Sequence, residues 1–249
     1  MRKSDDIEFS IIGAGRFGQF WGKRISKYYP TYFYDINPEQ KKKIVKFAHW
    51  DSLENCLEKK FIFLTVPIGK MKEFLKNNAN KFKSGSVMID CASVKVPVLN
   101  WLSNYLPQDI NYVASHPLFG PDSARNKLRD HIMVLMPGRV TYKDYRFLVQ
   151  FFTISLELHV YNLTAEDHDK LMAYNLNLVH HLGRALNDLG ITRLQLMMSG
   201  MEKLNEIVNV VMHDTQELFN DFYKYNPYSK KLYKNWQRSF DRIFDQLKR

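Results

Sequence analysis

The sequence predicts an α/β fold in two parts: a doubly wound parallel sheet in residues 1–163, followed by an all-helical C-terminal domain in residues 164–249. Up to about residue 163, short apolar runs alternate with segments of helical spacing, which is typical of a parallel sheet with helices on both faces. Beyond that point the apolar patterns have helical spacing. With 249 residues, 45% apolar and 25% charged, the chain is long enough to bury a core in each part.

The first part begins with a strand expected at 7–12, a glycine-rich turn, and a helix whose apolar positions are Phe17, Phe20 and Ile25. A second strand is expected to end at Asp35. The remaining strands are expected at 61–67, 86–93, 111–119, 131–137 and 157–163, and helices at 68–82, 96–106 and 142–154. These elements extend one sheet across the whole first part.

The turn after the first strand has the spacing G-x-G-x-x-G at Gly13, Gly15 and Gly18. In a Rossmann-type site the first glycine makes a tight turn, the second lets a pyrophosphate approach, and the third lets the helix pack on the strand. Asp35 ends the second strand, 22 residues after Gly13, where an acid accepts hydrogen bonds from the adenosine ribose. The alternative is a plain glycine turn beside a surface aspartate. Strand, turn, helix and acid together favour a dinucleotide site, to which four neighbouring residues also contribute: Arg16, Phe17, Val66 and Pro67.

The expected dinucleotide is NAD rather than NADP. Asp35 would repel a 2′-phosphate, and the next residues, Ile36 and Asn37, provide no arginine to bind one. The alternative is that the lysines at 41–43 reach back to this phosphate.

Composition excludes several other classes of protein. Two cysteines, Cys56 and Cys91, are too few for a metal ring or a disulfide framework, so we expect no metal and a reducing compartment, the cytoplasm. No apolar run approaches the roughly 20 residues that cross a bilayer, and the N-terminus turns acidic where a signal peptide would be apolar. We therefore expect neither membrane insertion nor export.

The net charge of +10 is concentrated near the C-terminus, where residues 224–249 contain eight Lys or Arg and two Asp. The same stretch has an apolar stripe at helical spacing, formed by Leu232, Trp236, Phe240, Ile243 and Leu247. We expect this helix to dock its stripe and leave its basic face in water, with no nucleic acid as partner. The alternative is binding to nucleic acid or a membrane surface.

Helices account for the remainder of the second part. Thr164 and Asp167 are spaced for a capping box, and Gly190 is placed to end the first helix. An apolar face on that helix comprises Leu171, Leu178, Leu182, Leu186 and Leu189. Because this part has more apolar helix than one short bundle needs to bury, we expect a homodimer formed mainly by the helices. A substrate is expected where the two parts meet.

Chemistry is expected at the carboxyl ends of the parallel strands. Four polar residues reach that edge: Ser93, Lys95, Ser115 and His116. His116 lies between a strand and Pro117, which fixes the backbone there. A histidine can take a proton at neutral pH, as oxidation of an alcohol by NAD requires. From position alone, a histidine that is only hydrogen-bonded within a strand end is an equal alternative.

Three segments resemble motifs of the prephenate and arogenate dehydrogenases in the same order: IDCASVK, ASHPLFGPDSA and LTAEDHDKLMAYNLNLVHHL. With the glycine turn these are four motifs in order, and the resemblance extends over most of the chain, strongly from 7 to about 185 and loosely beyond. The resemblance implies NAD-dependent oxidative decarboxylation of prephenate to 4-hydroxyphenylpyruvate, or of arogenate to tyrosine, in tyrosine biosynthesis. It implies that His116 accepts the hydroxyl proton and that Ser93 hydrogen-bonds the reacting hydroxyl or the histidine.

The resemblance also implies that the helical domain binds the substrate's carboxylates. His180 is the candidate, with Asn177 one turn before it, and Lys203 stands near the place of an arginine that the family uses. His168 and Asp169 are expected to fix the start of the helix. Two alternatives remain: another two-domain NAD-dependent dehydrogenase of the hydroxyacid type, and a catalytically silent NAD-binding regulator with a basic tail for nucleic acid.

Overall fold

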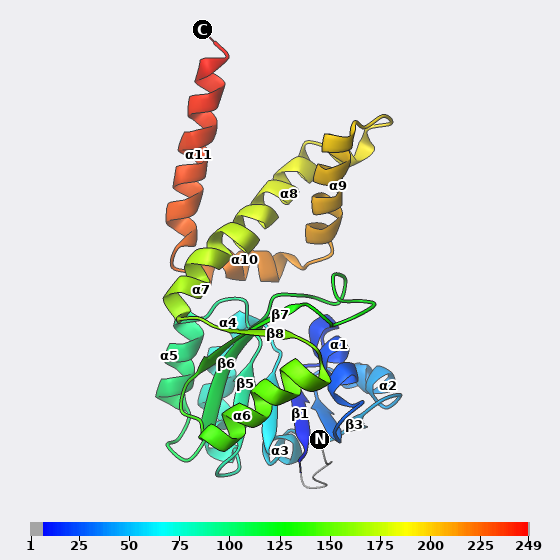
Figure 1. The fold of residues 1–249 in the computed structure, drawn as a ribbon, viewed down its shortest axis with the longest axis vertical. Helices are drawn as coiled ribbons and strands as arrows, with labels where there is room; N and C mark the ends of the chain where they lie inside the picture. Colours follow the sequence, from blue (N-terminus) through cyan, green and yellow to red (C-terminus); the bar gives the residue numbers. More distant parts are fainter. Residues whose placement is uncertain (1–6, 249) are drawn as a thin grey trace. The chain divides into compact units, whose positions relative to one another are not determined.

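The computed structural model describes residues 7–248, which form two compact units (Figure 1). The sheet unit comprises the chain up to Ser93 together with Val98–Thr164. The helical unit comprises Val94–Pro97 together with the chain from Ala165 onward. The four-residue segment Val94–Pro97 therefore belongs to the helical unit although residues on both sides of it belong to the sheet unit.

The sheet unit is built on eight strands in the order β3-β2-β1-β4-β5-β6-β7-β8. Their bounds are β1 (Phe9–Ile12), β2 (Thr31–Tyr34), β3 (His49–Trp50), β4 (Phe61–Leu64), β5 (Val87–Asp90), β6 (Asn111–Pro117), β7 (Ile132–Pro137) and β8 (His159–Asn162). The pairs from β3 to β6 are all parallel. This order is that of a doubly wound dinucleotide-binding sheet, so the predicted fold class is confirmed.

Helices connect the strands and bury their apolar side chains. They are α1 (Arg16–Ile25), α2 (Lys41–Ile44), α3 (Leu53–Leu57), α4 (Ile68–Asn78), α5 (Val96–Tyr105) and α6 (Tyr142–Gln150), which continues as a π-helix over Phe151–Ser155. On one face of the sheet, Trp21 of α1 packs with ring centroids 5.7 Å from Phe63 and 6.0 Å from Phe152. Figure 1 shows α6 lying across this face in front of the strands.

One pairing differs from the all-parallel prediction: β7 runs antiparallel to β6, with His116 opposite Val134. The connection over 118–131 lies wholly within the described chain and contains no helix. A parallel strand would need a crossover, usually a helix, to bring the chain back to the end of the sheet where β6 begins. Since this connection has none, the chain turns back and β7 runs antiparallel beside β6. β8 then pairs parallel to β7 because α6 and its π-helical extension supply a crossover.

The helical unit contains α7 (Ala165–Met172), a π-helix (Ala173–Leu178), α8 (Val179–Asp188), α9 (Ser199–Met212), α10 (Gln216–Tyr225) and α11 (Ser229–Gln246). The first three form one continuous helical run. It ends as predicted, because Gly190 follows with φ of +78°, a left-handed conformation that favours glycine.

The leucine face of this run is not the buried one. Leu171 is 47% exposed and Leu189 77%, and the other three leucines are half-buried. The buried residues are Ala165, His168, Asp169, Met172, Ala173, Asn177, His180 and Gly183. Gly183 explains part of this orientation, because a Cβ there would lie 2.5 Å from Val211 Cγ2 of α9. The close approach of α9 therefore selects the face with small and polar side chains.

We expected the C-terminal helix to dock its apolar stripe, and this expectation is wrong for the second half of α11. Leu232 is buried and Trp236 half-buried, but Phe240 is 59% and Ile243 62% exposed, and Leu247 beyond the helix is 80% exposed. Figure 1 shows why, since α11 extends away from the other helices of its unit. No helix within residues 7–248 is long and apolar enough to span a membrane.

Candidate active site

The glycine turn has the geometry that its sequence predicts. Gly13 has φ of +107° and donates its N–H to the Tyr34 carbonyl at 2.8 Å, which draws the ends of β1 and β2 together. A Cβ on Gly18 would lie 2.0 Å from the Gly13 carbonyl oxygen. Gly18 is therefore required for α1 to begin so close to the turn.

Gly15 occupies the N-cap position of α1, and no side chain caps this end. Apart from Gly15 itself, its chain neighbours and the adjoining backbone of α1, no atom of the described residues lies within 4 Å of where its Cβ would be. The backbone is thus open to an approaching group, and the first turn of α1 contains no acidic residue to repel an anion. This end of α1 fits a pyrophosphate.

Asp35 is fixed beside the same turn. Its Oδ2 accepts the Ala14 N–H at 2.5 Å and its Oδ1 accepts the Asn37 N–H at 2.8 Å. Both oxygens retain a lone pair, so the carboxylate can also accept ribose hydroxyls. Of the lysines at 41–43, Lys42 contacts Glu39 at 3.1 Å, and Lys43 contacts the Gln40 side chain at 3.3 Å.

The segment after β4 supports the turn from the other side. Thr65 donates its hydroxyl to the Gly13 carbonyl at 2.7 Å, an interaction that we did not predict. Val66 is half-buried, and Pro67 is exposed at the N-cap position of α4.

Arg16 and Phe17 lie in the first turn of α1 and point to different surroundings. Arg16 Nη2 contacts Asp122 Oδ2 at 2.6 Å, in the loop that follows β6. The Phe17 ring packs against Trp21, with centroids 6.1 Å apart. The half-buried Phe17 ring is therefore part of the packing around Trp21.

Asp90 joins the ends of β5 and β6, and sequence reasoning missed it. Its buried carboxylate accepts the N–H of Ala92 at 2.9 Å and that of Ser115 at 3.2 Å. Ser115 also donates its hydroxyl to the Asp90 carbonyl. These bonds bring the loop containing Ser93 and the strand containing His116 to the same edge of the sheet. The signal in the sequence was an acid at the last position of an apolar strand.

Ser93 and His116 are each 9% exposed. Within residues 7–248, the buried Oγ of Ser93 has no hydrogen-bond partner. Buried polar atoms are normally paired, and an unpaired one is a candidate for binding a ligand or water. Ser93 is therefore available to bond a substrate hydroxyl.

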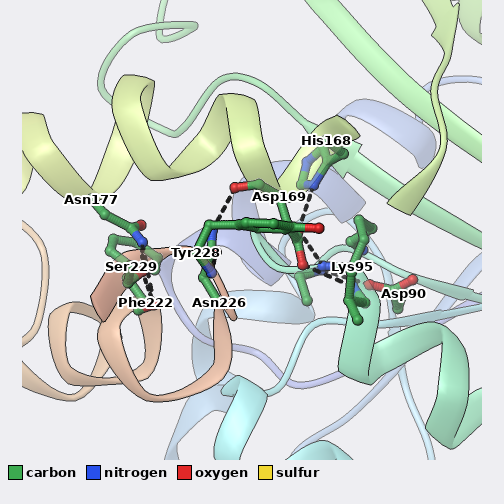
Figure 2. Close-up of polar contacts among 11 residues, drawn as sticks. Asp90, Lys95, His168, Asp169, Asn177, Phe222, Asn226, Tyr228 and Ser229 are labelled. Carbon is green, nitrogen blue, oxygen red and sulfur yellow. Dashed lines mark hydrogen bonds and ion pairs between the residues drawn. The ribbon is translucent and has the colours of Figure 1, made fainter. Parts of the chain in front are cut away.

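Asn177 lies in the π-helix and holds the turn between α10 and α11 (Figure 2). Its Nδ2 donates to the Phe222 carbonyl at 3.3 Å and to Ser229 Oγ. Its Oδ1 is buried and has no partner in the described part of the chain. The amide nitrogen therefore has a structural role, whereas the amide oxygen has no assigned role.

His180 is 3% exposed, with its Nε2 3.4 Å from Asp214 Oδ2 and its ring edge-on to Phe222 at 5.0 Å. Burial, and then the charge of Arg184, lowers the pKa of His180 to about 4. The ring is therefore neutral at pH 7. Its Nδ1 has no partner among the residues described. His180 can offer a hydrogen bond but no positive charge.

Two basic groups of the helical unit differ in their surroundings. Lys203 is exposed on α9. Arg184, one turn after His180, was not predicted as a site residue; it donates to the Asp214 carbonyl at 2.9 Å and to Gln216 Oε1 at 3.0 Å. The predicted site residues thus fall into two groups, with Ser93 and His116 in the sheet unit and the substrate-binding candidates in the helical unit.

A glycine turn open at Gly15, an acid at the end of β2 and this strand order define the class: a Rossmann-type dinucleotide-binding protein with a helical C-terminal unit. Residues 22–153 match the profile of the nucleotide-binding domain of prephenate dehydrogenase. The chain belongs to the prephenate dehydrogenase family. Residues 185–249 match a second profile, that of a TYRAAT1-like C-terminal domain.

Relatives and solved structures agree with this assignment. The chain is 25% identical to arogenate dehydrogenase 1 of Arabidopsis thaliana over 97% of its own length, but it spans only 39% of that protein. It is 22% identical to arogenate dehydrogenase 2 of the same plant, covering 99% of this chain and 71% of the relative. A crystal structure of prephenate dehydrogenase from A. aeolicus with hydroxyphenyl propionate and NAD+ has the same fold, with a TM-score of 0.76, 19% identity, and coverage of 97% and 90% of the two chains.

Proposed function

We propose that the protein is an NAD-dependent dehydrogenase that oxidatively decarboxylates prephenate or arogenate in tyrosine biosynthesis. The observation that carries the proposal is the position of Ser93, in the loop after β5, and of His116, at the end of β6, at one sheet edge where Asp90 joins the two strands. The same unit contains the glycine turn and Asp35. The names of the relatives support the choice of substrates, because they include arogenate dehydrogenases and a prephenate dehydrogenase.

The residues of the sheet unit fit NAD. Gly15 leaves open backbone for the pyrophosphate, and Asp35 is held where it can accept ribose hydroxyls. Arg16, Phe17, Val66 and Pro67 complete the proposed binding residues. When bound, NAD supplies the hydride acceptor for the reaction.

In the proposed reaction, His116 accepts the proton of the substrate hydroxyl while hydride leaves the carbon that bears this hydroxyl. Ser93 hydrogen-bonds the reacting oxygen. The bond from the opposite ring carbon to its carboxylate then breaks and carbon dioxide leaves. The electron pair of that bond completes an aromatic ring, and the ring oxygen takes back the proton that His116 accepted. Because aromatisation favours the products, the protein mainly orients and polarises the substrate.

The helical unit supplies the proposed groups for the carboxylates of the same substrate. Neutral His180 donates or accepts a hydrogen bond, with Asn177 beside it on the helix, and Lys203 provides a point charge. The unpartnered Nδ1 of His180 and Oδ1 of Asn177, within the described chain, support this assignment.

A second copy of the chain is the proposed partner of the helical unit, rather than nucleic acid. Large apolar side chains that a monomer would leave in water support this: Leu171, Tyr174, Leu189, Val210, Phe240, Ile243 and Phe244 are all at least 47% exposed. Light scattering across a range of concentrations tests it, since a constant monomer mass would contradict a homodimer. The cytoplasm is the proposed compartment, in keeping with the free thiols of Cys56 and Cys91.

One assay tests the proposed activity: NADH formation from NAD with prephenate and, separately, with arogenate. Turnover of either substrate is expected. Turnover of other hydroxyacids alone would favour the alternative dehydrogenase. NAD binding without turnover, together with salt-sensitive binding to DNA or RNA, would favour the regulator.

A further inference from the structure

Asp169 of α7 binds the chain just beyond Ser93. Its Oδ1 accepts the N–H of Lys95 at 2.7 Å, and its Oδ2 accepts the N–H of Val96 at 2.9 Å (Figure 2). Val96 is the first residue of α5. The carboxylate therefore caps α5 from a position 74 residues further along the sequence.

Asp169 is itself held in place. His168 Nδ1 lies 2.8 Å from its Oδ1, and Asn226 donates its side-chain N–H to the Asp169 carbonyl at 2.8 Å. Asn226 is in turn fixed by the Tyr228 N–H, which donates to its Oδ1 at 2.9 Å. Figure 2 shows these side chains converging on Asp169. Both Asp169 and His168 are completely buried.

These contacts make the segment after Ser93 rigid. A carboxylate at a helix N-terminus gains from the helix dipole, and its bonds to backbone N–H groups are charge-assisted. Inside a protein such bonds are strong, and losing one leaves a buried polar group unpaired. The backbone at Lys95 and Val96 is therefore anchored by a group that cannot shift at low energetic cost.

Ser93 needs such an anchor. Its Oγ has no hydrogen-bond partner within residues 7–248, so no protein contact to the hydroxyl fixes its direction. The hydroxyl position then depends on the backbone. That backbone is held before Ser93 by the Ala92 N–H bond to Asp90, and after it by the Lys95 and Val96 N–H bonds to Asp169.

We propose that Asp169 is a positioning residue for the reaction and acts through Ser93. The clamp, comprising Asp169, His168 and Asn226, holds the chain so that the Ser93 hydroxyl meets the reacting oxygen. This inference rests on the proposed function, because it assigns Ser93 a role in that reaction. A displacement of about 1 Å in such a group can cost on the order of 100-fold in rate.

A double-mutant cycle separates positioning from mere stabilisation. Asp169→Asn keeps the size of the side chain but places an N–H donor against one backbone N–H. It is expected to lower kcat by about 10- to 100-fold, with a smaller effect on KM. In a Ser93→Ala background the same change should lower kcat by less than about 3-fold, because the group being positioned is gone.

Asn226→Ala is the second variant, since it loosens the clamp while leaving the carboxylate in place. If Asp169→Asn fails to fold, Asn226→Ala takes its place in the cycle. It should lower kcat when Ser93 is present and have a much smaller effect in the Ser93→Ala background. Asp167→Asn is the matched control, because it removes the same charge from an exposed position of α7, 3.4 Å from Lys170. Its kcat should stay within about 2-fold of the parent, as should the NAD affinity of every variant.

Two failures are distinguishable. If the parent protein oxidises neither prephenate nor arogenate, the proposed function is overturned and the inference with it. Suppose instead that the parent is active, but that the clamp substitutions lower kcat by the same factor whether residue 93 is Ser or Ala. In that case the inference alone is overturned.

Discussion

Ser115 and Asp90 are joined twice, by the Ser115 N–H to the Asp90 carboxylate and by the Ser115 hydroxyl to the Asp90 carbonyl. Both residues are completely buried. The two contacts fix the end of β5 against the end of β6, immediately before Ser93 and His116. The geometry of the proposed catalytic pair thus depends on a buried acid at the end of β5.

Two glycine substitutions should separate the structural and the binding roles of the glycine turn. Gly18→Ala places a Cβ 2.0 Å from the Gly13 carbonyl, so it should lower the free energy of unfolding by about 1–3 kcal/mol. Gly15→Ala meets no described atom within 4 Å, so it should leave the unfolding free energy nearly unchanged and weaken NAD binding. Urea unfolding measures the free energy of unfolding of each variant, and NAD titration measures its affinity for NAD. Equal NAD affinity in Gly15→Ala and the parent would contradict a pyrophosphate at this position.

Asp35→Ser should reduce the preference for NAD over NADP. The substitution removes the carboxylate that repels a 2′-phosphate and accepts ribose hydroxyls, and the ratio of kcat/KM for the two cofactors should fall about 10-fold. Glu39→Ser is the control, because Glu39 is an exposed acid nearby that pairs with Lys42. Equal or better turnover with NADP than with NAD in the parent protein would contradict the assignment to Asp35.

His180 should make folding stability depend on pH. Its pKa is about 4 in the native state and about 6.5 when unfolded, so the unfolded chain binds a proton that the native state does not. Stability should therefore fall as pH drops through this window. Between pH 7 and 5 the loss due to His180 is about 2 kcal/mol. His180→Gln should remove it, whereas the control His159→Gln, at an exposed position, should not. Parallel pH profiles for the parent and His180→Gln would contradict a buried neutral ring.

Periodicity and turn chemistry were enough to predict most of the sheet. The glycine spacing, the acid at position 35 and the alternation of strand and helix are local signals, and the structure contains each of the expected strands. Strand direction is not a local signal: the apolar pattern of 132–137 is the same for either direction, and only the lack of a helix in the preceding connection makes β7 antiparallel.

The errors in the helical unit have a related cause. Helical spacing identifies an apolar stripe but not what covers it. Leu189 and Phe240 lie on the predicted stripes and are exposed in the single chain. The Asp169 clamp could not be predicted either. Its carboxylate accepts bonds from residues 73 and 74 positions away, and the donors are backbone N–H groups, which almost every residue has.

The most direct test of His116 as general base is the steady-state rate of NADH formation by His116→Asn, with prephenate or arogenate. Asparagine keeps a polar side chain of similar reach but cannot accept a proton at neutral pH. Turnover should fall by on the order of 10²- to 10⁴-fold, and the acid limb of the pH–rate profile should disappear. NAD affinity should be unchanged, because the glycine turn and Asp35 are untouched. A folded His116→Asn variant whose turnover stays within a few-fold of the parent would contradict His116 as the base.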